Sequence, residues 1–175
     1  MVYSIDYDGS LPAVHIGSFD HPHEIENQNG SETQWFTPLL EYGYQMQHLR
    51  CSADNGYSQD KQIQSYMINA MFSFGRPIDA ISTSKRIVLS ERGNDSSGNP
   101  LTHQCYAGMS DPVNWENDID FERHNDRANY LYADGHVSSL RFSETVGDGS
   151  EEENQHFVSE WLPHYVEVTD HDHEH

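Results

Sequence analysis

The sequence predicts an α+β fold for this chain, as a small domain organised around a β-hairpin. Three observations lead to this class: two short strand-like runs at 64–69 and 86–91, a hairpin pattern over 128–142, and a short amphipathic helix pattern over 35–42. Ten Tyr, seven Phe and three Trp among 175 residues carry enough apolar area for one hydrophobic core.

The helix pattern and the two strand-like runs follow from local composition. Pro38 suits the first turn of a helix, and apolar residues follow it at Leu39, Leu40 and Tyr42. The run at 86–91 is rich in β-branched residues, and polar or turn-forming residues bound both strand-like runs. We therefore expect a short helix that packs on a sheet.

The clearest local signal is the hairpin, in which Asp134 and Gly135 separate two strand-like runs. Asp-Gly favours a type I′ turn, because both central residues of that turn need a positive φ. Such a turn pairs Tyr132 with Val137 across the hairpin. Tyr130 then shares a face with Tyr132, and we expect this face to be buried.

Charge excludes two classes of partner. The chain has 9 basic and 29 acidic residues, so its formal net charge is 9 − 29 = −20. This surface repels phosphate backbones and anionic lipids, so it does not bind nucleic acid or a membrane through charge alone. Cations are the expected partners, and no run of about 18 apolar residues suggests a membrane helix.

The end of the chain differs in composition from the rest. After Arg141 there is no Lys or Arg, whereas ten acidic residues and five His occur. We therefore divide the chain into a head domain at 1–142 and an acidic, His-rich C-terminal extension at 143–175. The apolar spacing from Phe157 to Tyr165 indicates that part of this extension docks on the domain.

A signature of His, nine residues and Asp-Gly runs from His124 to Gly135. Further motifs precede it in order, at 7–12, 35–42, 51–54 and 65–69. Together they resemble the prepilin-type proteins that carry the H-x9-D-G domain. Cys51 is followed by Ser52, where that family usually has Pro.

The resemblance implies a type IV pilin-like or type II secretion pseudopilin-like head, in which an antiparallel sheet packs on a long apolar N-terminal helix. That helix and the prepilin peptidase site are missing from this sequence. The implied function is filament assembly, secretion or surface attachment, outside the cytoplasm in the periplasm or at the cell surface. The implied partners are other pilin-like subunits or secretion components, with polysaccharide as a further candidate and the membrane reached only through the missing helix.

An enzyme or a glycan-binding module on the same head is the alternative function, for example a secreted metal-assisted hydrolase. The sequence contains neither Gly-x-Ser-x-Gly nor His-Glu-x-x-His, so it predicts no catalytic residue. His124 and Asp134 do not form a catalytic pair either. Ten residues of extended chain would hold them about 30 Å apart.

Cys51 and Cys105 are the two cysteines of the chain. Their spacing excludes a Cys-x-x-Cys zinc or redox motif. The residues alone leave open one disulfide or two unpaired thiols. Because the resemblance implies an oxidising compartment, it favours the disulfide.

A carboxylate-rich loop before the hairpin predicts a site for Ca²⁺ or another divalent cation. The five candidate ligands are Asp118, Asp120, Glu122, Glu91 and His124. Four neighbouring carboxylates repel one another unless a cation neutralises them. Arg92 and Arg123 offer the alternative, because they would neutralise the same acids without a metal, and His124 would then only anchor the hairpin.

Overall fold

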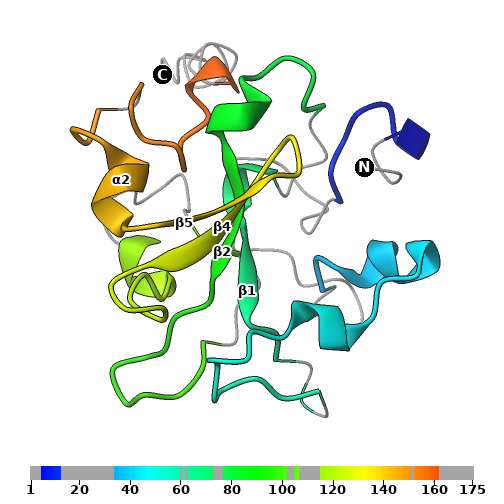
Figure 1. The fold of residues 1–175 in the computed structure, drawn as a ribbon. Helices are drawn as coiled ribbons and strands as arrows, with labels where there is room; N and C mark the ends of the chain where they lie inside the picture. Colours follow the sequence, from blue (N-terminus) through cyan, green and yellow to red (C-terminus); the bar gives the residue numbers. More distant parts are fainter. Residues whose placement is uncertain are drawn as a thin grey trace, which may run out of the picture.

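A five-stranded mixed sheet forms the centre of the molecule, with the strand order β3-β1-β2-β4-β5 (Figure 1). The strands are β1 (Tyr66–Asn69), β2 (Ile87–Glu91), β3 (Cys105–Tyr106), β4 (Ala128–Tyr132) and β5 (Val137–Leu140). This computed structural model describes residues 5–12, 34–59, 61, 63–72, 77–101, 105–106, 115–150 and 152–161. The fold is a small α+β domain, as expected.

The helical segments are short. They are α2 (Phe142–Val146) and the 3-10 helices η1 (Thr37–Tyr42), η2 (Met46–Leu49), η3 (Ala70–Phe72), η4 (Thr83–Lys85), η5 (Trp115–Asp118) and η6 (Ser159–Trp161). The helix expected at 35–42 is η1, which has Pro38 in its first turn and is capped after Tyr42 by Gly43, with a φ of 81°. No helix in the described part of the chain is long and apolar enough to cross a membrane.

The sheet is mixed, whereas the resemblance implies an antiparallel one. β1 pairs antiparallel with β2, β2 with β4, and β4 with β5, but β3 pairs parallel with β1 through Ile68 and Cys105. Two parallel neighbours need a long connection, and β1 and β3 are separated in the sequence by residues 70–104, which include β2.

The hairpin forms where it was predicted, but its turn type and register differ. Only Gly135 of the Asp-Gly pair has a positive φ, 94°, and its N–H donates to the carbonyl of Tyr132 at 2.9 Å. The loop therefore contains three residues, 133–135, in place of the two of a type I′ turn. As a result, Val137 pairs with Leu131 instead of Tyr132.

Each face of the sheet carries its own hydrophobic cluster. Fully buried members of the first include Ile68, Met71, Phe72, Leu49 and Val158, and those of the second include Met67, Ile87, Tyr106 and Tyr130. Tyr130 and Tyr132 share the second cluster and are buried, as predicted. Residues of η1 and η2 pack on the first cluster and α2 on the second, on opposite sides of the sheet (Figure 1).

The folded body continues past residue 142, where we expected the head domain to end. Val158 and Trp161 lie in the first cluster, with exposed fractions of 0% and 6%. The N–H of Ile87 donates to the carbonyl of Gln155 at 2.9 Å, and Arg86 forms a salt bridge with Glu160 at 2.9 Å. Residues up to 161 are therefore part of the same body, whereas 162–175 lie outside the described residues.

Candidate functional site

Cys51, Glu91 and His124 converge from three separate segments of the chain. The Sγ atom of Cys51 lies 3.4 Å from Nε2 of His124, and the same nitrogen lies 2.8 Å from Oε1 of Glu91. One ligand-type atom from each residue falls within 4.8 Å of the other two. We call this group the Cys–Glu–His cluster, and it is the one such group of three among the described residues.

Glu91 forms the buried floor of the cluster. It is the last residue of β2, and its side chain is 0% exposed. Asn129 on the adjacent strand β4 donates to the carboxylate from its backbone N–H at 3.2 Å and from its side-chain amide at 3.4 Å. These donors offset the cost of burying the carboxylate and fix its orientation.

His124 lies in the loop before β4, and the backbone there sets the position of its ring. Its N–H donates to the carbonyl of Arg127 at 2.8 Å, which closes a tight turn. The next two residues, Asn125 and Asp126, have φ values of 56° and 61°. Asn and Asp enter this left-handed region more readily than most residues, so the local sequence suits the turn. The His124 side chain is 30% exposed, so solvent reaches the cluster at its ring.

Cys51 follows η2 and is tied to the start of β1. Its N–H donates to Oγ of Ser65 at 2.9 Å, and the N–H of Ser65 donates to the carbonyl of Leu49 at 2.8 Å. Burial raises the pKa of the Cys51 thiol, and the negative charge of Glu91 also raises it. The thiol therefore keeps its proton at neutral pH.

The geometry does not fit a cysteine nucleophile. In a Cys–His–carboxylate triad, the thiol and the carboxylate contact opposite nitrogens of the imidazole. Here both Cys51 and Glu91 contact Nε2 of His124. This arrangement therefore differs from that of a nucleophilic triad.

Two arginines and two aspartates form a charge-balanced group beside the cluster. Arg92 pairs with Asp54 at 3.0 Å, and both side chains are almost completely buried. Arg123 pairs with Asp120 at 3.1 Å and lies 3.7 Å from Asp54. Burial lowers the pKa of Arg92, and the charge of Asp54 opposes that shift. The positive charge near Cys51 is therefore already compensated.

The structure brings together two of the five candidate ligands, Glu91 and His124. Asp118, Asp120 and Glu122 do not belong to the cluster. The side chain of Asp120 pairs with Arg123, which is the neutralisation that the sequence offered as an alternative.

Sequence reasoning missed Cys51 as a cluster member. Cys51 and His124 are 73 positions apart, so no local spacing connects them. The available signal was that both residues belong to motifs of the same resemblance. Cys51 and Cys105 form no disulfide in this structure, so the bond that the resemblance favours is absent, and Cys51 contacts His124.

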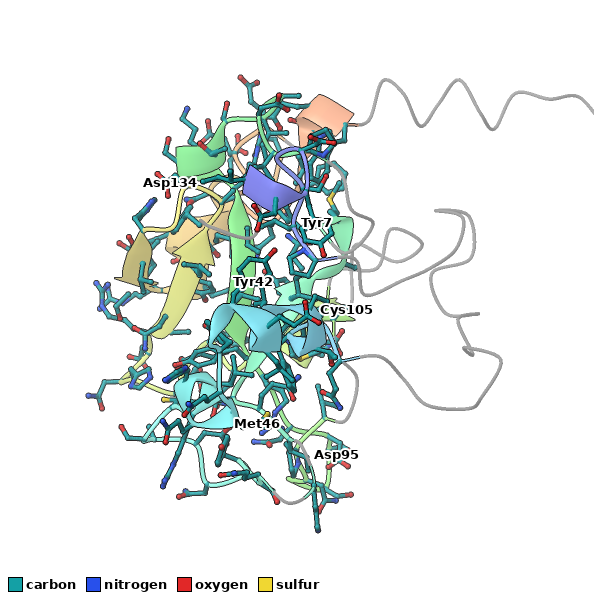
Figure 2. The ribbon with its side chains drawn as sticks, turned by 90° about the vertical axis from the view of Figure 1, so that its right-hand side faces the viewer. Tyr7, Tyr42, Met46, Asp95, Cys105 and Asp134 are labelled. Atoms are coloured by element: carbon teal, nitrogen blue, oxygen red, sulfur yellow. The ribbon has the colours of Figure 1, made fainter. Side chains whose placement is uncertain are left out.

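Asp134 plays a separate part from His124. Its Oδ1 accepts the N–H of His136 at 3.0 Å within the hairpin turn. In Figure 2, Asp134 lies towards the upper end of the molecule, whereas Met46 of η2, the helix that leads to Cys51, lies in the lower half. The signature residues therefore serve two different places.

A second histidine, His156, lies in a sealed hydrogen-bond network under α2. Ser90 donates to the Tyr106 hydroxyl at 2.7 Å, and that hydroxyl lies 3.0 Å from Nδ1 of His156. Nε2 of His156 lies 2.9 Å from Oγ1 of Thr145, which itself donates to the carbonyl of Phe142 at 2.7 Å. The directions of these bonds assign the proton of the neutral ring to Nε2.

The His156 network consists of Ser90, Tyr106, Thr145 and His156. His156 is 1% exposed, and burial lowers its pKa to about 3. Nδ1 already accepts the Tyr106 proton in this arrangement, so a second ring proton would break the bond. The network therefore holds a neutral histidine with a structural role.

The fold and the cluster define a small α+β domain with a mixed sheet and one partly exposed Cys–Glu–His cluster. Comparisons with protein-family models, with curated proteins and with solved structures found no match to this chain.

Proposed function

We propose that this domain is the head of a pilin-like or pseudopilin-like protein that acts outside the cytoplasm in filament assembly, secretion or surface attachment. The proposal rests on the resemblance to the H-x9-D-G proteins. In this reading, the head is carried on an apolar N-terminal helix that supplies the membrane contact and the filament core.

One observation supports the proposal most directly. Residues in the motifs that carry the resemblance connect separate segments of the fold through hydrogen bonds and contacts. Cys51 bonds to Ser65 and contacts His124, which links three of the motifs. Asn69, from the motif at 65–69, donates from its side chain to the carbonyls of Ile87 at 3.0 Å and His156 at 2.6 Å. A family that shares one architecture but varies its surfaces requires a common set of residues that maintain the scaffold, and these motif residues fit that requirement.

The charge and the chemistry of the domain agree with a binding or assembly role. The net charge of −20 disfavours nucleic acid and anionic membranes as partners. In the Cys–Glu–His cluster, Cys51 and Glu91 both contact Nε2 of His124. A nucleophilic triad instead has the thiol and the carboxylate on opposite nitrogens of the ring. In the proposed function, the domain therefore acts through surface contacts and assembly with other subunits.

The test is the fate of the full-length protein in the organism that encodes it. We expect mass spectrometry to find a mature N-terminus cut by prepilin peptidase, immediately before an apolar segment of about 20 residues. We also expect the protein in the sheared filament fraction or the cell envelope. Deletion of the peptidase gene should leave the uncut precursor in the membrane.

The control is a secreted protein of the same organism with an ordinary signal peptide, whose processing should not change in the deletion strain. If the protein that carries the present domain were instead released in soluble form in both strains, the proposal would be contradicted. That outcome would favour a secreted enzyme or glycan-binding module.

A further inference from the structure

The Cys–Glu–His cluster offers three different metal-binding groups at one partly exposed position. A thiol, a carboxylate and an imidazole come from the loop after η2, the end of β2 and the loop before β4. We propose that Cys51, Glu91 and His124 bind a divalent transition-metal ion, with Zn²⁺ as the preferred ion. This inference is independent of the proposed pilin-like function.

The distances between the ligand atoms are close to those of a zinc site. Tetrahedral zinc with ordinary bond lengths separates a sulfur and a nitrogen ligand by about 3.5 Å, and a nitrogen and a carboxylate oxygen by about 3.3 Å. Cys51 Sγ and His124 Nε2 are 3.4 Å apart, and His124 Nε2 and Glu91 Oε1 are 2.8 Å apart. A small outward movement of the His124 ring, on its exposed side, is enough to admit the ion.

The ligand types select the metal. Sulfur and imidazole suit zinc and its neighbours, whereas Ca²⁺ takes oxygen ligands. Cys51 thus replaces the calcium expectation with a transition metal. Binding displaces the thiol proton, and a thiolate, a carboxylate and a neutral imidazole then balance the two positive charges of the ion.

The residues around the cluster are placed to orient the ligands. Asn129 holds the Glu91 carboxylate through two donors, and Ser65 fixes the backbone of Cys51. Outer partners of this kind orient metal ligands and tune their affinity. Arg123 is already paired with Asp120, so its charge near the site is compensated.

The site differs from a closed structural zinc centre. It has three protein ligands, and the His124 side chain is 30% exposed. Zinc sites with three protein ligands keep the fourth position for water or another small ligand. We therefore expect an exchangeable ion whose fourth ligand comes from solvent.

Cobalt spectroscopy of the full, reduced chain tests the inference. Co²⁺ substitutes for Zn²⁺, and a thiolate ligand gives a sulfur-to-cobalt charge-transfer band in the near ultraviolet. We expect the band to grow to one equivalent of Co²⁺ and to disappear when Zn²⁺ is added. The other His residues of the chain cannot produce this band, because it requires sulfur.

Matched variants locate the ion. Cys51→Ser should abolish the band, whereas Cys105→Ser should keep it. His124→Asn should weaken Co²⁺ binding by more than about tenfold, since loss of even an outer partner of a metal ligand costs that much. His136→Asn is the control for histidine loss and should bind Co²⁺ like the wild type.

Circular dichroism must show that each variant is folded before its spectrum is compared. A band that persists in Cys51→Ser, or that disappears in Cys105→Ser, would overturn the assignment to this cluster. The absence of any thiolate band in the folded wild-type chain would overturn the metal site itself. Neither result would bear on the fate of the full-length protein in its host.

Discussion

His124 and His156 show how one residue type takes opposite parts in the same small domain. The ring of His124 contacts a thiol and a carboxylate, and the His124 side chain is 30% exposed. The ring of His156 lies between two hydroxyl groups and is 1% exposed. Both rings have hydrogen-bond partners on the protein, yet only one of them is open to solvent.

The partners explain the difference in role. Hydroxyl groups can satisfy both nitrogens of a neutral imidazole without adding charge, so a sealed site suits His156. A carboxylate and a thiol carry or can develop negative charge, so His124 sits where a cation would be stabilised. Burial alone therefore predicts function less well than the chemistry of the neighbours.

The largest loss of stability is expected when the buried histidine, His156, is truncated. His156→Ala leaves a cavity and removes one hydrogen-bond partner of the Tyr106 hydroxyl, so it should lower the free energy of unfolding by about 4 kcal/mol. Urea denaturation measures this change. His136→Ala is the control, because His136 is exposed beside the hairpin turn, and its loss should cost about 1 kcal/mol or less. Equal losses in both variants would contradict the structural role of the network.

Acid should destabilise the domain through the same residue. Unfolded His156 has its ordinary pKa near 6.5, and burial lowers the folded value to about 3. Between these two pKa values the unfolded state binds a proton that the folded state does not. The contribution of His156 to the free energy of unfolding is therefore fully present above pH 6.5 and is lost as the pH falls towards 3. The slope is about 1.4 kcal/mol per pH unit, or about 2 kcal/mol at pH 5.

Denaturation curves at several pH values check this slope against His156→Gln, which does not titrate. The wild type should lose about 2 kcal/mol more than the variant between pH 7 and pH 5. Parallel losses in the two proteins would show that other groups cause the acid sensitivity.

The hairpin turn should be separable from the metal site. Gly135 has a φ of 94°, and no atom lies within 4 Å of a Cβ placed there, so the cost of a side chain is conformational. Gly135→Val should lower stability by about 1–2 kcal/mol and leave the cobalt band unchanged. Gly135→Asn should recover most of the loss, because Asn tolerates the left-handed region. A normal melting temperature for Gly135→Val would count against the turn.

The smallest effect is expected at the acidic loop. Asp120 is partly exposed and pairs with Arg123, so Asp118→Asn combined with Asp120→Asn should cost about 1 kcal/mol or less. Zn²⁺ binding, measured by calorimetry, should persist and weaken only slightly, because Arg123 loses Asp120 but keeps Asp54 at 3.7 Å. Loss of binding in this double variant would place the ion on the acidic loop, as the sequence first suggested.

The strands were predictable because their signals are local. The β-branched run at 86–91 and the paired runs around Asp134 and Gly135 need no information from elsewhere in the chain. The register failed because Asp-Gly supports more than one turn, and a single extra loop residue shifts every cross-strand pair. β3 was missed because two residues, Cys105 and Tyr106, are too few to form a pattern.

The candidate site was predictable only in part. Glu91 and His124 were proposed together because a charge-rich loop was expected to meet a strand end. Cys51 joins them through the packing of η2 and β1, which no periodicity encodes. Asp120 was assigned to the metal on charge alone, and the distance to Arg123 decided between the two readings.

The position of Val158 and Trp161 in the first cluster has a consequence for synthesis of the protein. A ribosome releases the chain from its N-terminus, so β1 and β2 emerge long before the residues that complete their covering. The hairpin of β4 and β5 can form within microseconds of its release, since its contacts are local. The central strands must wait with apolar surface exposed until residue 161 has left the ribosome. We therefore expect the nascent chain to be prone to chaperone binding until Trp161 can pack.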